Sequence, residues 1–170
     1  MRVFFVRHAQ STMNTQKHLI CGQLNHIQLS QEGKEQAKKL GEHFAPIRFH
    51  AIYSSSAVRA IQTATAIAKQ SQFPTQELHT TDLLLERSQG DWSNQVRAEK
   101  YTPQVMATFF AKNGQFAAPN GESDEEVSNR MLSFLTFISQ NHLSHETLLV
   151  VSHGMAIKDM LWKVLQKPRT

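Results

Sequence analysis

The sequence predicts an α/β fold, specifically a three-layer α/β/α sandwich around a mainly parallel central sheet. Segments typical of strands alternate along the chain with segments typical of helices. The two clearest strand segments, residues 3–6 and 147–152, are short, continuous and apolar, as expected of strands that are buried on both faces. No repeat or low-complexity linker interrupts the alternation, so we expect residues 1–170 to form a single domain.

Two strong helix patterns occupy the first half of the chain. Residues 8–29, which follow the first strand segment, show little periodicity and predict a long functional loop with some local helix. Ser30 is a typical N-cap for the helical pattern of residues 31–45, which Pro46 ends. Three further elements are expected there: a short strand at 50–55, a helix at 56–70 and a weak, peripheral strand at 74–80.

The second half of the chain contains the best helix-start signals. Thr102 and Pro103 form an N-cap and first-turn pair, and Ser123 and Glu126 have the spacing of a capping box. Turn-forming residues fill 113–121. The expected elements are helices at 104–113, 127–138 and 154–167 and a buried strand at 147–152.

Composition narrows the class of partner. The 18 Lys and Arg residues exceed the 14 Asp and Glu residues without a long cationic run or groove-reading motif, so the charge suits an anionic small molecule as well as nucleic acid. Trp92 and Tyr101 form no stacking platform with clustered cations, so no nucleic acid is expected. Cys21 is the single cysteine, which excludes an internal disulfide. Residues 1–6 lack a signal-peptide pattern and no apolar stretch approaches the roughly 20 residues of a membrane span, so a cytoplasmic protein without a membrane partner is expected.

Polar side chains follow both of the clearest strand segments. Arg7 and His8 come directly after the first, and His153 follows the last. Ligands collect at the carboxyl ends of strands in open α/β sheets, so these groups meet if the two strands are neighbours. Arg59, at the start of the helix after the second strand, adds a planar guanidinium that can hold two phosphoryl oxygens. The combination favours a phosphoryl-binding site.

A metal site is not expected. His142 and His145 have an H-x-x-H spacing, but no third His, Asp, Glu or Cys at ligand spacing completes the set. The sequence therefore predicts neither a metal nor another cofactor.

Six blocks of sequence resemble, in order, the motifs of the histidine phosphatase superfamily, the phosphoglycerate mutase-like enzymes of branch 1. The first block is similar to the Arg-His-Gly-x-[Ser/Thr]-x-x-Asn signature that opens this family. The blocks are VRHAQSTMN, GQLNHIQLSQEGKEQAKKLG, YSSSAVRAIQTA, LLLERSQGDW, PNGESDEEVSNR and VVSHG. Because they cover nearly the whole chain, the resemblance is specific, and it implies a phosphoglycerate mutase-like fold.

The resemblance implies covalent catalysis on a histidine. It places a phosphohistidine intermediate on His8, a role that requires a neutral imidazole with its lone pair aimed at phosphorus. Arg7, Arg59 and His153 correspond to the family's phosphate clamp, which neutralises charge on the transferring group without a metal.

Three further residues receive roles from the same resemblance. Ser11 and Asn14 are expected to donate additional hydrogen bonds to the phosphate. Glu86 stands where the family commonly carries the acid that protonates the leaving alkoxide and then acts as a base for water. The apolar run of residues 83–85 predicts an apolar setting that keeps this carboxyl protonated until needed, whereas the alternative is a surface salt bridge with Arg87.

The chain departs from the family pattern in three places. Ala9 replaces the usual glycine after the nucleophile, where positive φ is restricted for alanine. Asn25 stands where Asp is common. His153 lies close to the end of the 170 residues, so we expect a shorter sheet edge, a truncated chain, or an exposed edge that a partner covers, and a homodimer is one such assembly.

The activity favoured by these features is hydrolysis of phosphomonoesters of small metabolites. The segment between Glu86 and His153 is shorter than in glycolytic mutases, and Arg97 and Lys100 are its main basic residues near the acid. A cofactor-dependent phosphoglycerate mutase is the alternative. A phosphohistidine-protein phosphatase and a catalytically silent phospho-ligand sensor rank below both.

Overall fold

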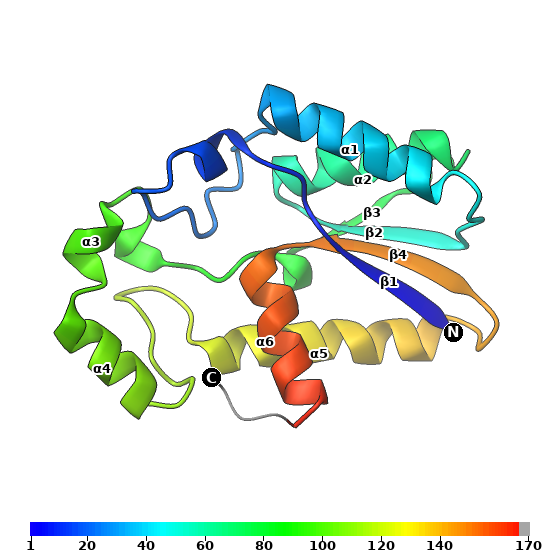
Figure 1. Cartoon of the computed structure of the whole chain (residues 1–170). Coiled ribbons are helices and arrows are strands. Elements are labelled where there is room, and N and C mark those ends of the chain that lie inside the picture. The colour runs from blue at the N-terminus through cyan, green and yellow to red at the C-terminus, as the bar shows by residue number, and fades with distance from the viewer. Residues whose placement is uncertain (167–170) are drawn as a thin grey trace.

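A parallel sheet forms the centre of the computed structural model, which describes residues 1–166 (Figure 1). Its strands are β1 (Arg2–Arg7), β2 (Ala51–Ser55), β3 (His79–Thr81) and β4 (Thr147–Ser152). All described pairings are parallel and the spatial order is β1-β4-β2-β3. The last strand therefore lies between the first and the second.

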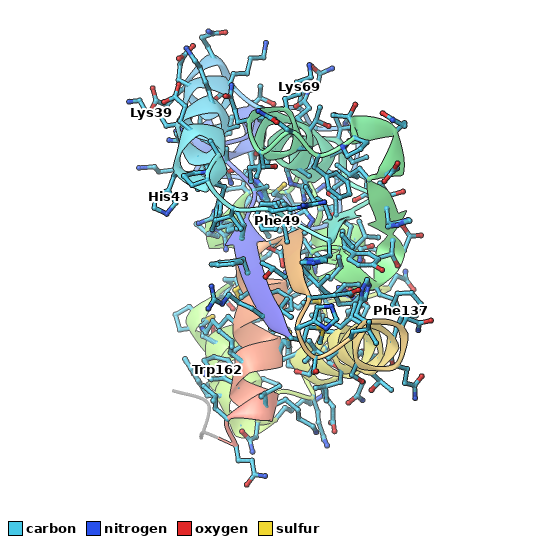
Figure 2. The ribbon with its side chains drawn as sticks, turned by 90° about the vertical axis from the view of Figure 1, so that its right-hand side faces the viewer. Lys39, His43, Phe49, Lys69, Phe137 and Trp162 are labelled. Carbon is cyan, nitrogen blue, oxygen red and sulfur yellow. The ribbon has the colours of Figure 1, made fainter. Side chains whose placement is uncertain are left out.

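Helices cover both faces of the sheet. Figure 1 shows α1 (Gln31–Phe44) and α2 (Val58–Gln70) on one face, and α5 (Asp124–Asn141) and α6 (Gly154–Val164) on the other. Figure 2 shows the same layers from the side, with Lys39 and His43 on α1, Phe137 on α5 and Trp162 on α6. Within residues 1–166, no helix combines the length and the apolar character that crossing a bilayer requires.

The sequence of β4 explains this layering, because every residue from Leu148 to Ser152 is buried. Successive side chains of a strand point to opposite faces. Leu148 and Val150 accordingly pack into the core under α5 and α6, whereas Leu149 and Val151 pack into the core under α1 and α2. The three-layer α/β/α sandwich predicted from the sequence is confirmed.

A smaller group of helices lies beyond the carboxyl ends of the strands. It consists of α3 (Arg97–Lys100) and α4 (Pro103–Ala111) with their connecting loops (Figure 1). Thr102 caps α4 by accepting a hydrogen bond from the N–H of Val105, as its spacing to Pro103 predicts. These helices therefore face the edge of the sheet at which Arg7 and His153 are placed.

Most element ends differ from the predicted ones by one or two residues, and the larger differences concern β3, α3, α5 and α6. The strand expected at 74–80 is a 3-10 turn over Thr75–Glu77 followed by β3, because the register pairs β2 only with residues from His79 onward. The short helix α3 was not predicted, because four residues are too few to show a repeated helical spacing of apolar residues. Helix α5 extends the predicted element at both ends, starting directly after the Ser123 capping box. Helix α6 ends at Val164, and Lys167 lies outside the described residues.

Candidate active site

The first and last strands bring two histidines together. Parallel pairing of β1 with β4 sets Arg7 opposite Ser152, and the N–H of His8 donates to the Ser152 carbonyl at 2.9 Å. The His8 and His153 ring centroids are consequently 4.9 Å apart. The neighbouring strand ends expected from the sequence therefore meet at one point of the sheet.

His8 is held as one tautomer. Its Nδ1 lies 2.7 Å from the carbonyl oxygen of Ala9, which can only accept, so Nδ1 carries the proton. Its Nε2 accepts a hydrogen bond from Nε of Arg59 at 3.3 Å. The pKa of His8 is lowered to about 4, mainly by burial and also by the positive charges of Arg59 and Arg7, against the opposing effect of the Ala9 carbonyl. His8 is thus a neutral imidazole whose lone pair is on Nε2.

Arg59 connects the two histidines. Its side chain comes from the first turn of α2 and is almost completely buried. The carbonyls of Leu24 and Gly22 accept hydrogen bonds from its two terminal nitrogens at 2.8 and 3.3 Å. Nη2 also lies 3.3 Å from Nδ1 of His153. The guanidinium therefore lies at the point where an anion would contact both rings.

His153 is fixed by a residue that the sequence analysis missed. Nε2 of His153 donates to Oγ of Ser55 at 2.8 Å, because Nδ1 accepts from Arg59. The ring is fully buried, and burial together with the positive charge of Arg59 holds the pKa of His153 well below its usual range. Ser55 is the last residue of β2, and the run of serines at this strand end is the sequence feature that could have indicated a polar contact here.

Neutral burial of His8 predicts a loss of stability in acid. The pKa is 6.5 in the unfolded reference and about 4 in the folded chain. Between these values the unfolded chain binds a proton at this residue and the folded chain does not. The free energy of unfolding should therefore be fully retained above pH 6.5, and the His8 contribution should fall by about 3 kcal/mol as the pH drops to about 4.

Chemical denaturation of wild type and His8→Gln between about pH 7 and pH 4 measures this contribution. The glutamine variant should lose stability less steeply, because it has no imidazole to protonate. His18→Gln, at an exposed position, is the control. Equal slopes for wild type and His8→Gln would show that His8 does not contribute.

The loop after His8 is anchored to both helices of the adjacent layer. Thr63 of α2 accepts the N–H of Ala9 at 3.1 Å, and the N–H of Ser30 donates to the Gln10 carbonyl at 2.9 Å. Helix α1 approaches so closely that a Cβ on Gly33 would lie 1.8 Å from that carbonyl oxygen. Glycine at position 33 is therefore required by the position of this loop.

Ser11 and Asn14 form a capping box around the 3-10 turn Thr12–Thr15. Oδ1 of Asn14 accepts hydrogen bonds from both the N–H and the hydroxyl of Ser11 at 2.9 Å, which leaves its amide nitrogen as the atom it can offer to an anion. Asn14 lines the cavity beside His8, whereas Ser11 is fully buried and outside the lining. We therefore now expect Ser11 to position Asn14 rather than to contact a ligand.

His8, Arg59 and Asn14 line a cavity of about 220 Å³, and His153 is not among its lining residues. Arg7 lies at its exposed side, next to Gly154, where an added Cβ would be 3.4 Å from Nε of Arg7. Charged and polar side chains from β1, from the loop after it and from α2 thus share one space. The site residues that line it are Arg7, His8, Asn14, Arg59 and Glu86.

Glu86 enters the same cavity from the loop between β3 and α3. Its Oε1 accepts hydrogen bonds from the N–H groups of Arg87 and Ala156 at 3.0 and 3.1 Å, and its Oε2 accepts from Met155 at 3.3 Å. Met155 and Ala156 belong to the first turn of α6. The carboxylate is therefore surrounded by backbone donors here rather than by the apolar setting that residues 83–85 led us to expect.

Arg130 of α5, which the sequence analysis also missed, holds the backbone of this loop. Its Nη1 donates to the carbonyls of Leu83 and Leu85 at 3.0 and 2.7 Å, and its Nη2 donates to the Glu86 carbonyl at 3.0 Å. The same guanidinium forms a two-point ion pair with Glu122. Arg130 is the last residue of the PNGESDEEVSNR block, so the sequence marked it as part of a family motif. The block did not indicate that its side chain holds the Glu86 loop.

Arg130→Met is expected to lower the free energy of unfolding by about 3 kcal/mol. It leaves the Glu122 carboxylate without its cationic partner and the Leu83 and Leu85 carbonyls without their donor, while the Glu86 carbonyl keeps the amide of Gln23. Arg130→Lys should lower the free energy of unfolding less, because lysine retains the positive charge. It should still be less stable than the wild type, because lysine lacks the planar arrangement of donors. Denaturant unfolding measures the loss, with exposed Arg48→Met as the control. A loss equal to that of the control would contradict this role.

The H-x-x-H pair does not form a metal centre. His142 instead lies 2.6 Å from Oε2 of Glu146 through Nδ1 and 2.8 Å from the Tyr53 hydroxyl through Nε2. Within the described part of the chain, no group of three His, Cys, Asp or Glu side chains is placed to hold a metal ion.

Known proteins show the same sequence pattern and the same fold. The sequence profile of the histidine phosphatase superfamily (branch 1) matches residues 3–170. The 2,3-bisphosphoglycerate-dependent phosphoglycerate mutase of Bartonella bacilliformis is 30% identical over 161 residues, which cover 92% of this chain and 77% of that protein. Phosphoserine phosphatase 1 of Hydrogenobacter thermophilus is 30% identical over 171 residues, which cover 97% and 76%.

A solved structure agrees with the fold. The native structure of a mycobacterial glucosyl-3-phosphoglycerate phosphatase matches with a TM-score of 0.83 at 22% identity, covering 96% of this chain and 79% of that one. The sequence profile extends over nearly the whole chain, and the paired histidines with their arginines stand where the resembling motifs predict them. The chain therefore belongs to the histidine phosphatase superfamily, branch 1.

Proposed function

We propose that this protein hydrolyses phosphomonoesters of small metabolites through a phosphohistidine on His8, without a metal ion. The observation that carries the proposal is the fixed tautomer of His8. The Ala9 carbonyl holds the proton on Nδ1, and burial keeps the ring neutral, so Nε2 is an unprotonated nucleophile at the floor of a cationic cavity.

In the first half-reaction, the Nε2 lone pair attacks phosphorus and the bond from phosphorus to the ester oxygen breaks. The leaving oxygen takes a proton from the Glu86 carboxyl, so the alcohol departs neutral. A protonated Glu86 with its O–H on Oε2 can donate that proton while Oε1 keeps accepting the N–H groups of Arg87 and Ala156. The products are a phosphoramidate on His8 and an ionised Glu86.

Arginines stabilise the charge on the transferring group. Three equatorial oxygens carry that charge, and Arg59 and Arg7 both line the cavity together with His8. The amide nitrogen of Asn14 is a further donor. His153 acts through Arg59: its Nδ1 accepts from Nη2 of that guanidinium and its Nε2 is bonded to Ser55, so the ring orients the arginine toward the phosphoryl group.

In the second half-reaction, Glu86 takes a proton from water as the water oxygen attacks phosphorus. The bond between phosphorus and Nε2 breaks, and inorganic phosphate leaves with His8 restored to its neutral form. The net reaction consumes one water molecule per ester. Cations and backbone donors supply the stabilisation in both steps, so no step requires a Lewis acid.

The proposal is tested by phosphate release from a panel of phosphorylated metabolites in the presence of EDTA. Release that persists with chelator is the expected result, and complete loss that added Mg²⁺ restores would overturn the metal-independent mechanism. Including 3-phosphoglycerate, with detection of both inorganic phosphate and 2-phosphoglycerate, distinguishes hydrolysis from isomerisation.

A phosphoglycerate mutase is the second candidate. The similarity to the Bartonella bacilliformis mutase favours it, and the basic residue Arg97 lines the same cavity as His8. A mutase would return the phosphoryl group to a second hydroxyl of the substrate instead of to water. Formation of 2-phosphoglycerate faster than inorganic phosphate would establish this alternative.

A further inference from the structure

A second cavity of about 500 Å³ adjoins the phosphate cavity. The two share four lining residues, Arg87, Arg97, Tyr101 and Met155, so they lie side by side. The first cavity is lined by His8, Arg7 and Arg59, and the second lies toward α4 and α6. A phosphomonoester with its phosphorus at His8 can therefore place its alcohol portion in the second cavity.

Helix α4 presents an apolar surface to this second cavity. Met106, Phe109 and Phe110 have the spacing that places side chains on one face of a helix, and all three line the space. None of the residues of α4 is buried, although most of them are apolar. Met155 and Trp162 of α6 also contribute to the lining; Figure 2 labels Trp162 on this helix. The surface that α4 and α6 present to the cavity, an apolar wall, is therefore suited to contact with an apolar ligand.

The cations on the same lining are already engaged with aromatic rings. The guanidinium of Arg87 lies 5.8 Å from the ring centroid of Phe109, and that of Arg97 lies 5.5 Å from the centroid of Tyr101. The ammonium group of Lys158 lies 4.0 Å from the centroid of Trp162. Arg87 is also paired with Asp124. A cation over a ring face is attracted to that face. The cavity therefore presents mainly hydrocarbon and ring surface to a ligand.

We infer that the alcohol portion of the substrate is a bulky aromatic or apolar group, held between α4 and α6. This inference rests on the proposed hydrolysis at His8 and narrows its substrate class. Small polar alcohol portions, such as those of phosphoserine and 3-phosphoglycerate, would leave the apolar wall exposed to water. Catalytic efficiency should accordingly rise with the apolar surface of the alcohol.

Two primary alkyl phosphates separate this effect from leaving-group chemistry. Ethyl phosphate and 2-phenylethyl phosphate release alcohols of similar acidity, but only the second can fill the cavity. For the wild type, kcat/KM for 2-phenylethyl phosphate should exceed that for ethyl phosphate by about tenfold or more. Phosphoserine and 3-phosphoglycerate should give values near that of ethyl phosphate.

Variants localise the preference. Phe109→Ala and Trp162→Ala should each reduce the ratio of the two kcat/KM values severalfold, because each removes part of the wall. Phe137→Ala is the matched control, since this exposed phenylalanine lies on α5 and lines neither cavity (Figure 2). It should leave the ratio unchanged.

Binding of phosphonates tests the cavity without turnover. Calorimetry should show tighter binding of 2-phenylethylphosphonate than of ethylphosphonate to the wild type. Equal binding together with equal kcat/KM values overturns the inference while leaving hydrolysis intact. Tighter binding of the aromatic phosphonate without phosphate release from any ester supports the cavity and overturns the proposed hydrolysis instead.

Discussion

His8→Ala should abolish phosphate release, with kcat falling by about 10⁴-fold or more. The variant lacks the imidazole nitrogen that lines the phosphate cavity with an unprotonated lone pair beside Arg59. His153 cannot replace it, because its ring is fully buried and bonded to Ser55 and Arg59. Turnover of para-nitrophenyl phosphate in EDTA measures the loss.

The control for this variant is His18→Ala, which changes an exposed histidine and should retain wild-type turnover. Rapid quenching of the wild type with substrate should also trap an acid-labile phosphoramidate, which mass spectrometry would locate on the His8 peptide. Undiminished turnover in His8→Ala, with the protein folded by circular dichroism, would rule out His8 as the nucleophile.

Glu86→Gln should slow the hydrolysis of ethyl phosphate by about 10²-fold or more and that of para-nitrophenyl phosphate by less than about tenfold. An alkoxide leaves poorly without a proton, whereas para-nitrophenolate leaves well unaided. Glutamine retains one oxygen that can accept the N–H groups of Arg87 and Ala156, so the loop should keep its position. Steady-state kinetics on the two esters measure the difference.

Glu77→Gln provides the matched control, since Glu77 is exposed in the 3-10 turn before β3. It should leave both esters at wild-type rates. Equal losses on both esters in Glu86→Gln would mean that Glu86 shapes the cavity without donating a proton.

Elements with strong local signals were predictable from the sequence. The residues of β4 could be identified because an uninterrupted apolar run is typical of a strand buried on both faces. The N-caps Ser30, Thr102 and Ser123 were identifiable from side chains that satisfy free N–H groups within three residues. These signals need no knowledge of the rest of the chain.

Local sequence patterns could not predict the contacts between residues that lie far apart in the chain. The position of His153 beside His8 depends on β4 inserting between β1 and β2, which only the assembled sheet determines. Ser55 and Arg130 likewise act through partners far away in sequence. The family resemblance named Arg7, His8, Asn14, Arg59 and Glu86 of the cavity lining, but it assigned them no hydrogen-bond partners.

The two substitutions in family motifs have different outcomes. Ala9 does not adopt a positive φ, and its methyl group packs with Leu29 and Ala37, so the expected backbone restriction does not arise. Asn25 has a buried Oδ1 without a hydrogen-bond partner among residues 1–166. Its backbone carbonyl accepts the N–H of Val58 at the start of α2, which carries Arg59. The side chain of Asn25 has no evident structural role.

Three expectations from the sequence stay predictions: the cytoplasmic location, the single-domain organisation and the homodimer. Sedimentation or light scattering on purified protein would test the last of these directly.

The pairing of β1 with β4 has a consequence for how this site tolerates mutation. Adjacent strands lie about 4.8 Å apart in a sheet, and the two imidazole centroids are separated by 4.9 Å. The strand pairing therefore brings the two histidines to adjacent positions, and the hydrogen bonds of their rings to Ala9, Arg59 and Ser55 fix the orientation. Side chains in the two cores can drift over evolutionary time, and those that line the alcohol cavity can be exchanged for new specificities, while the reacting groups keep their separation.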